Sequence, residues 1–114
     1  MAGFTDYLED KVLDHVFGGT AYTAPSTLYV GLFTAAPSDT GGGTEVSGGS
    51  YARKSMPAMT VSGTSPTTAT NGAAVEFVTA TGSWGTVTHV GIFDASSSGN
   101  LLCWAALSAS KVVA

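Results

Sequence analysis

Apolar residues recur every three or four positions across residues 4–17, which is the spacing of one face of a helix. This apolar stripe consists of Phe4, Leu8, Val12 and Val16, and it is widened by Leu13 and Phe17. Thr5 or Asp6 can cap the start of the helix, and the glycines at 18–19 end it. The spacing therefore predicts an amphipathic helix that packs either on its own sheet or on a neighbouring protein.

After the helix the pattern changes to short apolar runs separated by Gly, Ser and Pro, which is typical of strands and turns. We expect strands at 27–35, 51–59, 73–80, 84–95 and 101–107, with one weak strand or none in 60–72, and a hairpin turn at 96–100. Pro57 indicates that the end of the second strand is either a sheet edge or not a strand at all. The fold class is mainly β: a small β-sandwich or barrel of about six short strands with one N-terminal amphipathic α-helix.

The run at 84–95 is the predicted centre of the sheet. Residues 90–95 repeat residues 30–35 almost one for one, with apolar residues on both faces and a glycine at the same place. Such a glycine indicates a bulge or a neighbour whose backbone comes close.

The chain is expected to form a single domain, residues 1–114, with a helical arm at 1–19 and a β domain at 27–114. The Gly-rich segment 40–50 is predicted to be an exposed, mobile loop. The segment from Lys111 ends on Val-Val-Ala without a polar tail, so either the last strand pairs as it stands or the natural chain continues beyond it.

Charge is scarce in this chain, because only 11% of its residues are charged while 44% are hydrophobic. A soluble monomer usually keeps more charge, so part of the surface is expected to lie against other copies or another protein. The net charge of −4 with four Lys plus Arg argues against nucleic acid as a partner. No apolar run is long enough to cross a membrane, and the N-terminus lacks a signal-peptide pattern.

Residues suited to catalysis do not form a convincing set. His89 and Asp94 lie on opposite faces of one predicted strand, and no G-x-S-x-G motif surrounds a serine. His15, His89 and Cys103 lack metal-ligand spacing, and Cys103 reads as a small buried hydrophobe. We therefore expect no catalytic residues, no cofactor and no metal, and predict that the protein is not an enzyme.

Aromatic residues offer one further kind of site. A sugar-stacking face could be formed by Trp84, Trp104, Tyr22, Tyr29 and Tyr51, although core packing explains the same residues. Trp84, between two glycines at the start of a strand, is the one expected to be exposed.

Three segments together, at 28–37, 44–53 and 84–95, carry a resemblance to a known family. They read L-Y-V-G-L-F-T-A-A-P, T-E-V-S-G-G-S-Y-A-R and W-G-T-V-T-H-V-G-I-F-D-A. In this order they resemble small virion proteins of tailed bacteriophages, which are often labelled tail fibre proteins. In that family a further strand pair usually follows the A-L-x-x-S-K-x-V segment, and its lack here supports a C-terminus that is incomplete.

The resemblance implies a non-enzymatic virion structural protein, made in the bacterial host cytoplasm. Its compact, low-charge β domain favours a capsid decoration or cement protein that bridges capsid subunits; the alternative is a minor tail or tail-fibre component that contacts host surface glycan. Expected partners are the major capsid protein or other virion proteins, and further copies of the chain, with a trimer favoured. The residues predicted to contact partners are Phe4, Leu8, Val12, Val16, Glu45, Tyr51, Arg53 and Trp84. Arg53 in particular is expected to pair with an acidic group of a partner.

Overall fold

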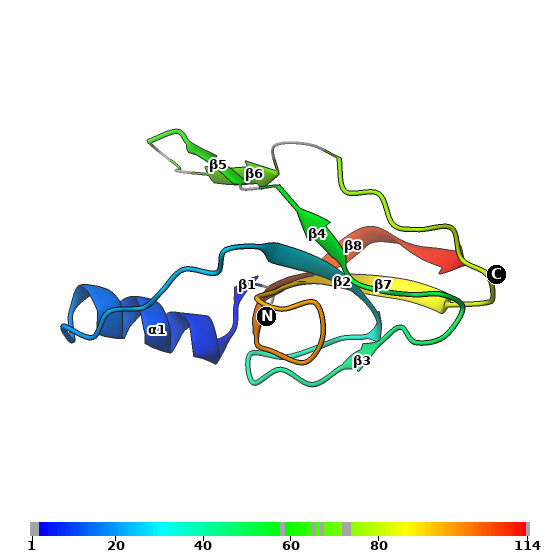
Figure 1. The fold of residues 1–114 in the computed structure, drawn as a ribbon, viewed down its shortest axis with the longest axis horizontal. Helices are drawn as coiled ribbons and strands as arrows, with labels where there is room; N and C mark the ends of the chain where they lie inside the picture. The colour runs from blue at the N-terminus through cyan, green and yellow to red at the C-terminus, as the bar shows by residue number, and fades with distance from the viewer. Residues whose placement is uncertain (1–2, 58, 65, 67, 72–73, 114) are drawn as a thin grey trace.

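The computed structural model describes residues 3–57, 59–64, 66, 68–71 and 74–113. Its main sheet has six antiparallel strands in the order β1-β8-β7-β2-β3, with β4 also paired to β2, and a separate two-stranded sheet joins β5 to β6 (Figure 1). The strands are β1 Gly3–Phe4, β2 Leu28–Ala35, β3 Thr44–Glu45, β4 Lys54–Met56, β5 Met59–Ser62, β6 Thr68–Asn71, β7 Gly85–Phe93 and β8 Leu101–Val113. The described residues contain one helix, α1, Asp6–Val16, and together with the strands it confirms the predicted mainly β class with one N-terminal helix.

The two repeated segments form the centre of the main sheet, as their apolar pattern predicts. β2 and β7 pair antiparallel so that Gly31 lies directly opposite Gly91. A Cβ atom on Gly91 would lie 2.6 Å from Leu101 Cδ1 and 3.0 Å from the ring of Phe33. The expectation of an approaching backbone is therefore corrected: the glycines make room for side chains, and the rings of Phe33 and Phe93 stack there with centroids 5.9 Å apart.

β8 is one strand of 13 residues that runs alongside β7. Its last residues pair with the start of β7, with Val112 opposite Thr86 and Val113 opposite Gly85. The register shifts between Val87 and His89, so the strand pair continues past an irregularity rather than ending there. The apolar segment from residue 111 thus extends β8 instead of starting another strand.

Two strand predictions are wrong. The Thr-rich segment that was expected to hold one weak strand or none contains the hairpin β5–β6, paired from Met59↔Asn71 to Ser62↔Thr68. The strand predicted at 73–80 does not form across residues 74–80, and residue 73 lies outside the described part of the chain. Phe77 is held there by aromatic packing on Tyr51 and Trp84, which needs no strand ladder.

β3 and β4 share one edge of β2, because β7 occupies the other. Within the predicted strand at 51–59, Lys54–Met56 pairs with β2, whereas Met59 pairs with Asn71 in the β5–β6 hairpin. Pro57 follows β4 directly, so β4 ends there at the edge of the sheet. The Gly-rich segment before it is not one open loop. It contains β3 and turns Val46 into a buried cluster with Trp84 and Val87.

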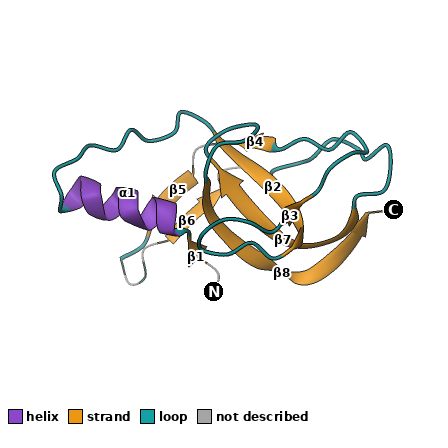
Figure 2. Ribbon diagram, turned by 90° about the horizontal axis from the view of Figure 1, so that it is seen from below, coloured by secondary structure: helices purple, strands orange, loops and turns teal. Residues whose placement is uncertain are grey.

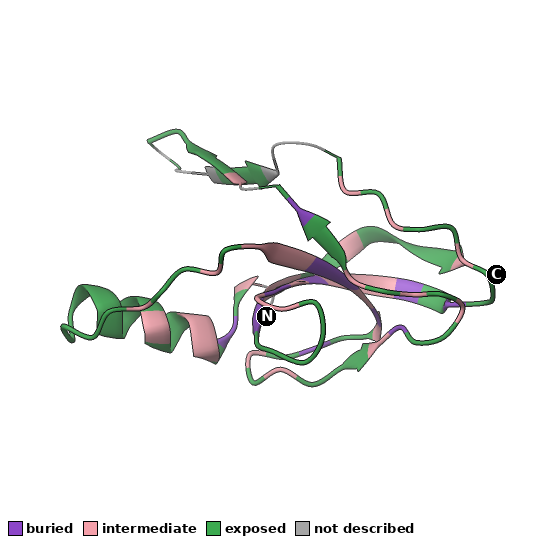
Figure 3. Ribbon diagram, viewed as in Figure 1, coloured by how far each residue is buried: buried purple, intermediate pink, exposed green. Residues whose placement is uncertain are grey.

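α1 begins at the predicted cap and projects from one end of the sheet (Figure 2). The Thr5 hydroxyl accepts from the Leu8 backbone N–H at 3.5 Å and donates to the Leu101 carbonyl at 2.6 Å, so one side chain both caps the helix and ties it to β8. No residue of α1 is buried, and Figure 3 shows most of the helix exposed. Within the described residues, no helix has the length and apolar character that a membrane span requires.

Candidate functional site

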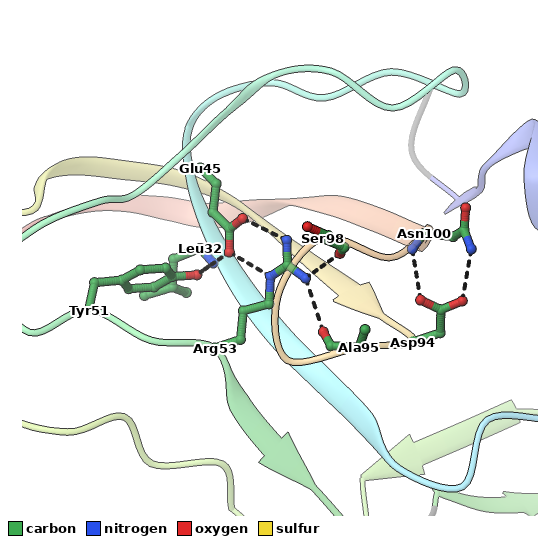
Figure 4. A network of polar contacts seen from close by, with 8 residues as sticks. All are labelled: Leu32, Glu45, Tyr51, Arg53, Asp94, Ala95, Ser98 and Asn100. Carbon is green, nitrogen blue, oxygen red and sulfur yellow. Dashed lines mark hydrogen bonds and ion pairs between the residues drawn. The ribbon is translucent and has the colours of Figure 1, made fainter.

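The residues predicted to contact partners fall into three places. Phe4 lies in β1, while Leu8, Val12 and Val16 lie on α1. A second group, Glu45, Tyr51 and Arg53, meets beside the edge of β2 (Figure 4). Trp84 is in the core. The structure therefore brings together the polar members of the set and separates them from the helix.

Arg53 is the hub of the polar group (Figure 4). Its Nε and Nη2 donate to the two carboxylate oxygens of Glu45, each at 2.9 Å. Its Nη1 donates to the backbone carbonyls of Ala95 at 3.0 Å and Ser98 at 2.8 Å. The guanidinium also lies 3.4 Å from the ring centroid of Phe93. One side chain thus joins β3, the end of β7 and the turn before β8.

This geometry corrects the expectation that Arg53 pairs with an acidic group of a partner. Its side chain is 9% exposed, and its ion pair is made inside the chain with Glu45. A bidentate Arg–carboxylate pair is oriented by its fork and is stronger than a neutral hydrogen bond. Arg53 therefore acts as an internal brace for the turn.

Glu45 and Tyr51 complete the brace. The Tyr51 hydroxyl donates to Glu45 Oε2 at 2.7 Å and accepts from the Leu32 backbone N–H at 2.9 Å. Burial raises the pKa of the Glu45 carboxyl, but the hydrogen bonds from Arg53 and Tyr51 outweigh it and hold that pKa below its ordinary value. Burial, together with the hydrogen bond to Glu45, raises the pKa of the Tyr51 phenol.

Trp84 is not the exposed aromatic that the sequence suggested. It is 7% exposed, its indole N–H donates to the Gly49 carbonyl at 2.9 Å, and its ring packs edge-on against Tyr51. Trp84 and Tyr51 both pack in the core, so neither ring is available to stack on a sugar.

A polar pocket of about 470 Å³ lies between the brace and the start of α1. It is lined by Thr5, Asp6, Tyr7, Asp39, Glu45, Arg53 and neighbouring residues. Asp39 Oδ1 is buried there without a hydrogen-bond partner among the described residues. No group of three or more His, Cys, Asp or Glu suited to a metal ion occurs within the described ranges.

The two histidines and Asp94 each contact different residues. His89 Nδ1 lies 2.8 Å from the Thr88 hydroxyl, and its ring contacts Trp104. Asp94 instead accepts from the backbone and side-chain N–H groups of Asn100, at 2.7 and 3.0 Å (Figure 4). His15 accepts from the Tyr22 backbone N–H at 3.0 Å. Each group has a local structural partner.

An uncovered apolar surface lies on α1 and its C-cap residue Phe17. We call it the helix stripe, and it consists of Leu8, Val12, Leu13, Val16 and Phe17. Leu13 is 57% exposed, Val16 60% and Phe17 82%. Leu13 and Phe17 widen the predicted apolar stripe that packs on its own sheet or on a neighbouring protein, and both are exposed.

A second apolar surface, which the sequence did not reveal, lies on one face of the main sheet. We call it the sheet groove; it has a volume of about 700 Å³ and is walled by β1 and the β5–β6 hairpin. Its lining includes Phe4, Val30, Met56, Val90, Ile92 and Cys103. Burial raises the pKa of the Cys103 thiol. The apolar residues on both faces of β2 and β7 predict a buried centre, whereas the structure leaves one of these faces open as the sheet groove.

Comparison with known proteins identifies the family. A family model described as podophage GP4 fiber I protein gp80 matches residues 3–114. No match was found among the curated proteins. The matched range includes the three segments on which the resemblance to phage virion proteins rests, and it includes the helix, the brace and the sheet groove. The chain therefore belongs to the podophage GP4 fiber I protein family, a family of phage virion fibre proteins.

Proposed function

We propose that this protein is a non-enzymatic structural component of a podophage tail fibre, that it works as one domain with a helical arm, and that it assembles with further copies of itself. The observation that carries the proposal is the helix stripe: α1 buries none of its residues, although its apolar side is wide. Exposed apolar patches of this kind on small proteins mark interaction sites. The family match supports a fibre as the assembly in which that site is used.

The choice of a fibre over the capsid surface rests on the family. Composition and compactness favoured a capsid decoration protein, with a tail-fibre component as the alternative. The family description supports the alternative, and no feature of the structure favours the capsid. The major capsid protein is therefore replaced by other tail proteins as the proposed neighbour, alongside further copies of the chain.

Copy number in the virion tests this choice. A tail-fibre component is expected in far fewer copies than the major capsid protein, whereas a decoration protein approaches capsid copy number. Quantifying both bands on a gel of purified, intact virions measures the ratio directly. A ratio close to one decoration protein for every capsid subunit would overturn the fibre assignment.

A homotrimer remains our choice of assembly, because closed cyclic symmetry suits a fibre that is built around one axis. Contact with a host glycan is not assigned to Trp84 or Tyr51, since both rings pack in the core. The polar pocket beside Arg53 is the place where such a contact could form hydrogen bonds.

A further inference from the structure

We propose that the helix stripe of one copy docks in the sheet groove of a second copy of this chain. The inference rests on the proposed self-assembly and names the two surfaces that make it. The occupant must be apolar, because the described residues that line the groove carry no charged side chain. The helix stripe is apolar and uncovered, and it occurs on every copy.

The helix of the same chain cannot fill this groove along its length. Thr5 is fixed to the carbonyls of Leu101 and Leu102, and α1 points away from the sheet beyond that anchor (Figure 2). At 1.5 Å per residue, Val16 lies roughly 16 Å along the helix from Thr5. The exposed end of the stripe is therefore presented to another molecule.

The surface area suits a stable complex. From exposed fractions of 39–82% for Val12, Leu13, Val16 and Phe17, the stripe offers on the order of 500 Å² of apolar surface. Each contact, counted with a comparable area of groove, buries on the order of 1,000 Å², which reaches the size that a specific protein interface needs, and a closed ring of copies repeats it at every junction. With the stripe docked, the acidic face of α1, which carries Asp10 and Asp14, stays in solvent.

An engineered disulfide tests the contact, because Cys103 lies in the groove and is the only cysteine of the chain. In the Val16→Cys variant, we expect the new thiol of one copy to reach Cys103 of the next copy. Within one chain, residue 16 lies at the far end of α1 from the sheet, which exceeds the roughly 7 Å between Cα atoms that a disulfide allows. We expect covalent dimers or a closed ring of copies on non-reducing gels after mild oxidation. Val16 is exposed, so the substitution leaves the fold intact.

Asp14→Cys is the matched control, since it places a thiol at the same end of the helix on the opposite face. It is expected to give little cross-linked product, and Val16→Cys combined with Cys103→Ser is expected to lose the Val16–Cys103 product. A Val16→Cys protein that stays monomeric, or an Asp14→Cys protein that cross-links equally well, would overturn the proposal.

The native thiol gives an independent measurement on the unaltered protein. Alkylation of Cys103 by iodoacetamide is expected to slow roughly tenfold or more when the protein is concentrated enough to associate, and Leu13→Asp with Val16→Asp is expected to remove that protection. Protection that appears only in virions, with a free protein that stays monomeric, would mean that another virion protein fills the groove and would overturn the second-copy contact. The copy-number ratio does not depend on the cross-linking or alkylation results. If the second-copy contact fails these tests, the ratio still tests the fibre assignment separately.

Discussion

At the scale of single residues, Arg53 holds more of the structure together than any other polar side chain described. Arg53→Ala removes the bidentate ion pair and two hydrogen bonds to the 95–98 turn, and it leaves the partly buried Glu45 carboxylate without its cation. We expect the free energy of unfolding to fall by about 2–3 kcal/mol. Urea denaturation of wild type and variant measures it.

Glu45→Gln combined with Arg53→Met is the control. It removes the ion pair without leaving a charged Glu45 carboxylate that lacks its cation. The double variant is expected to recover part of the loss. An Arg53→Ala protein within about 0.5 kcal/mol of wild type, the range of ordinary surface substitutions, would show that the brace does not stabilise the fold.

The same pair sets the acid sensitivity of the fold. Glu45 has a folded-state pKa below its ordinary value of 4.5, so its contribution is complete above that value and is lost as the pH falls through the folded pKa. We expect the midpoint temperature of unfolding to fall as the pH is lowered from about 7 to about 3, and to fall less in Glu45→Gln. Equal slopes for the two proteins would remove Glu45 as a cause.

Sequence reasoning reached some residues of the site and not others. It narrowed the helix cap to Thr5 or Asp6, because a cap depends on neighbours in the sequence, and the structure shows that Thr5 is the cap. It placed Glu45, Tyr51 and Arg53 in one set, yet it could not show that they pair with one another. That pairing depends on β3 and β4 sharing one edge of β2, which no local pattern specifies.

At the scale of elements, α1 is attached to the β domain chiefly at its first turn. Thr5 is 1% exposed and its hydroxyl serves both the helix cap and the contact with β8. We expect Thr5→Ala to lower stability by about 1–2 kcal/mol and to release the helix. Hydrogen exchange should then speed up in residues 6–16 while the β7 and β8 amides stay protected.

Thr5→Ser keeps the hydroxyl and is expected to behave like wild type in the same experiment. Unchanged exchange of the helix amides in Thr5→Ala would mean that packing, rather than the cap, holds α1 in place.

Sequence reasoning misjudged two segments, each for its own physical reason. β5 and β6 are only four residues each, and Ala69 is the one apolar residue of β6, so the pair shows too little apolar alternation to indicate a half-buried strand. Residues 75–77 show that alternation but have no strand partner, because Phe77 packs on Tyr51 and Trp84. The central pair β2–β7 was found because its apolar pattern and its burial agree.

At the scale of the whole molecule, scarce charge and two uncovered apolar surfaces lead to the same expectation. The proposed assembly contacts are apolar, so an oligomer is expected to persist at ~1 M salt, where exposed ion pairs are largely screened. Light scattering of the purified protein at low and high salt measures the mass of the oligomer. Dissociation by salt would point to ionic contacts, and a monomer under both conditions would remove self-assembly.

The central claim is that this chain builds the tail fibre of the particle, and its place on the particle tests that claim most directly. Intact virions can be decorated with Fab fragments raised against the folded protein and imaged by electron microscopy, with Fab against the major capsid protein as the reference for head labelling. We predict that the label lies on the tail and its fibres and leaves the head shell bare. A label spread over the head shell in the pattern of the capsid lattice would contradict the account.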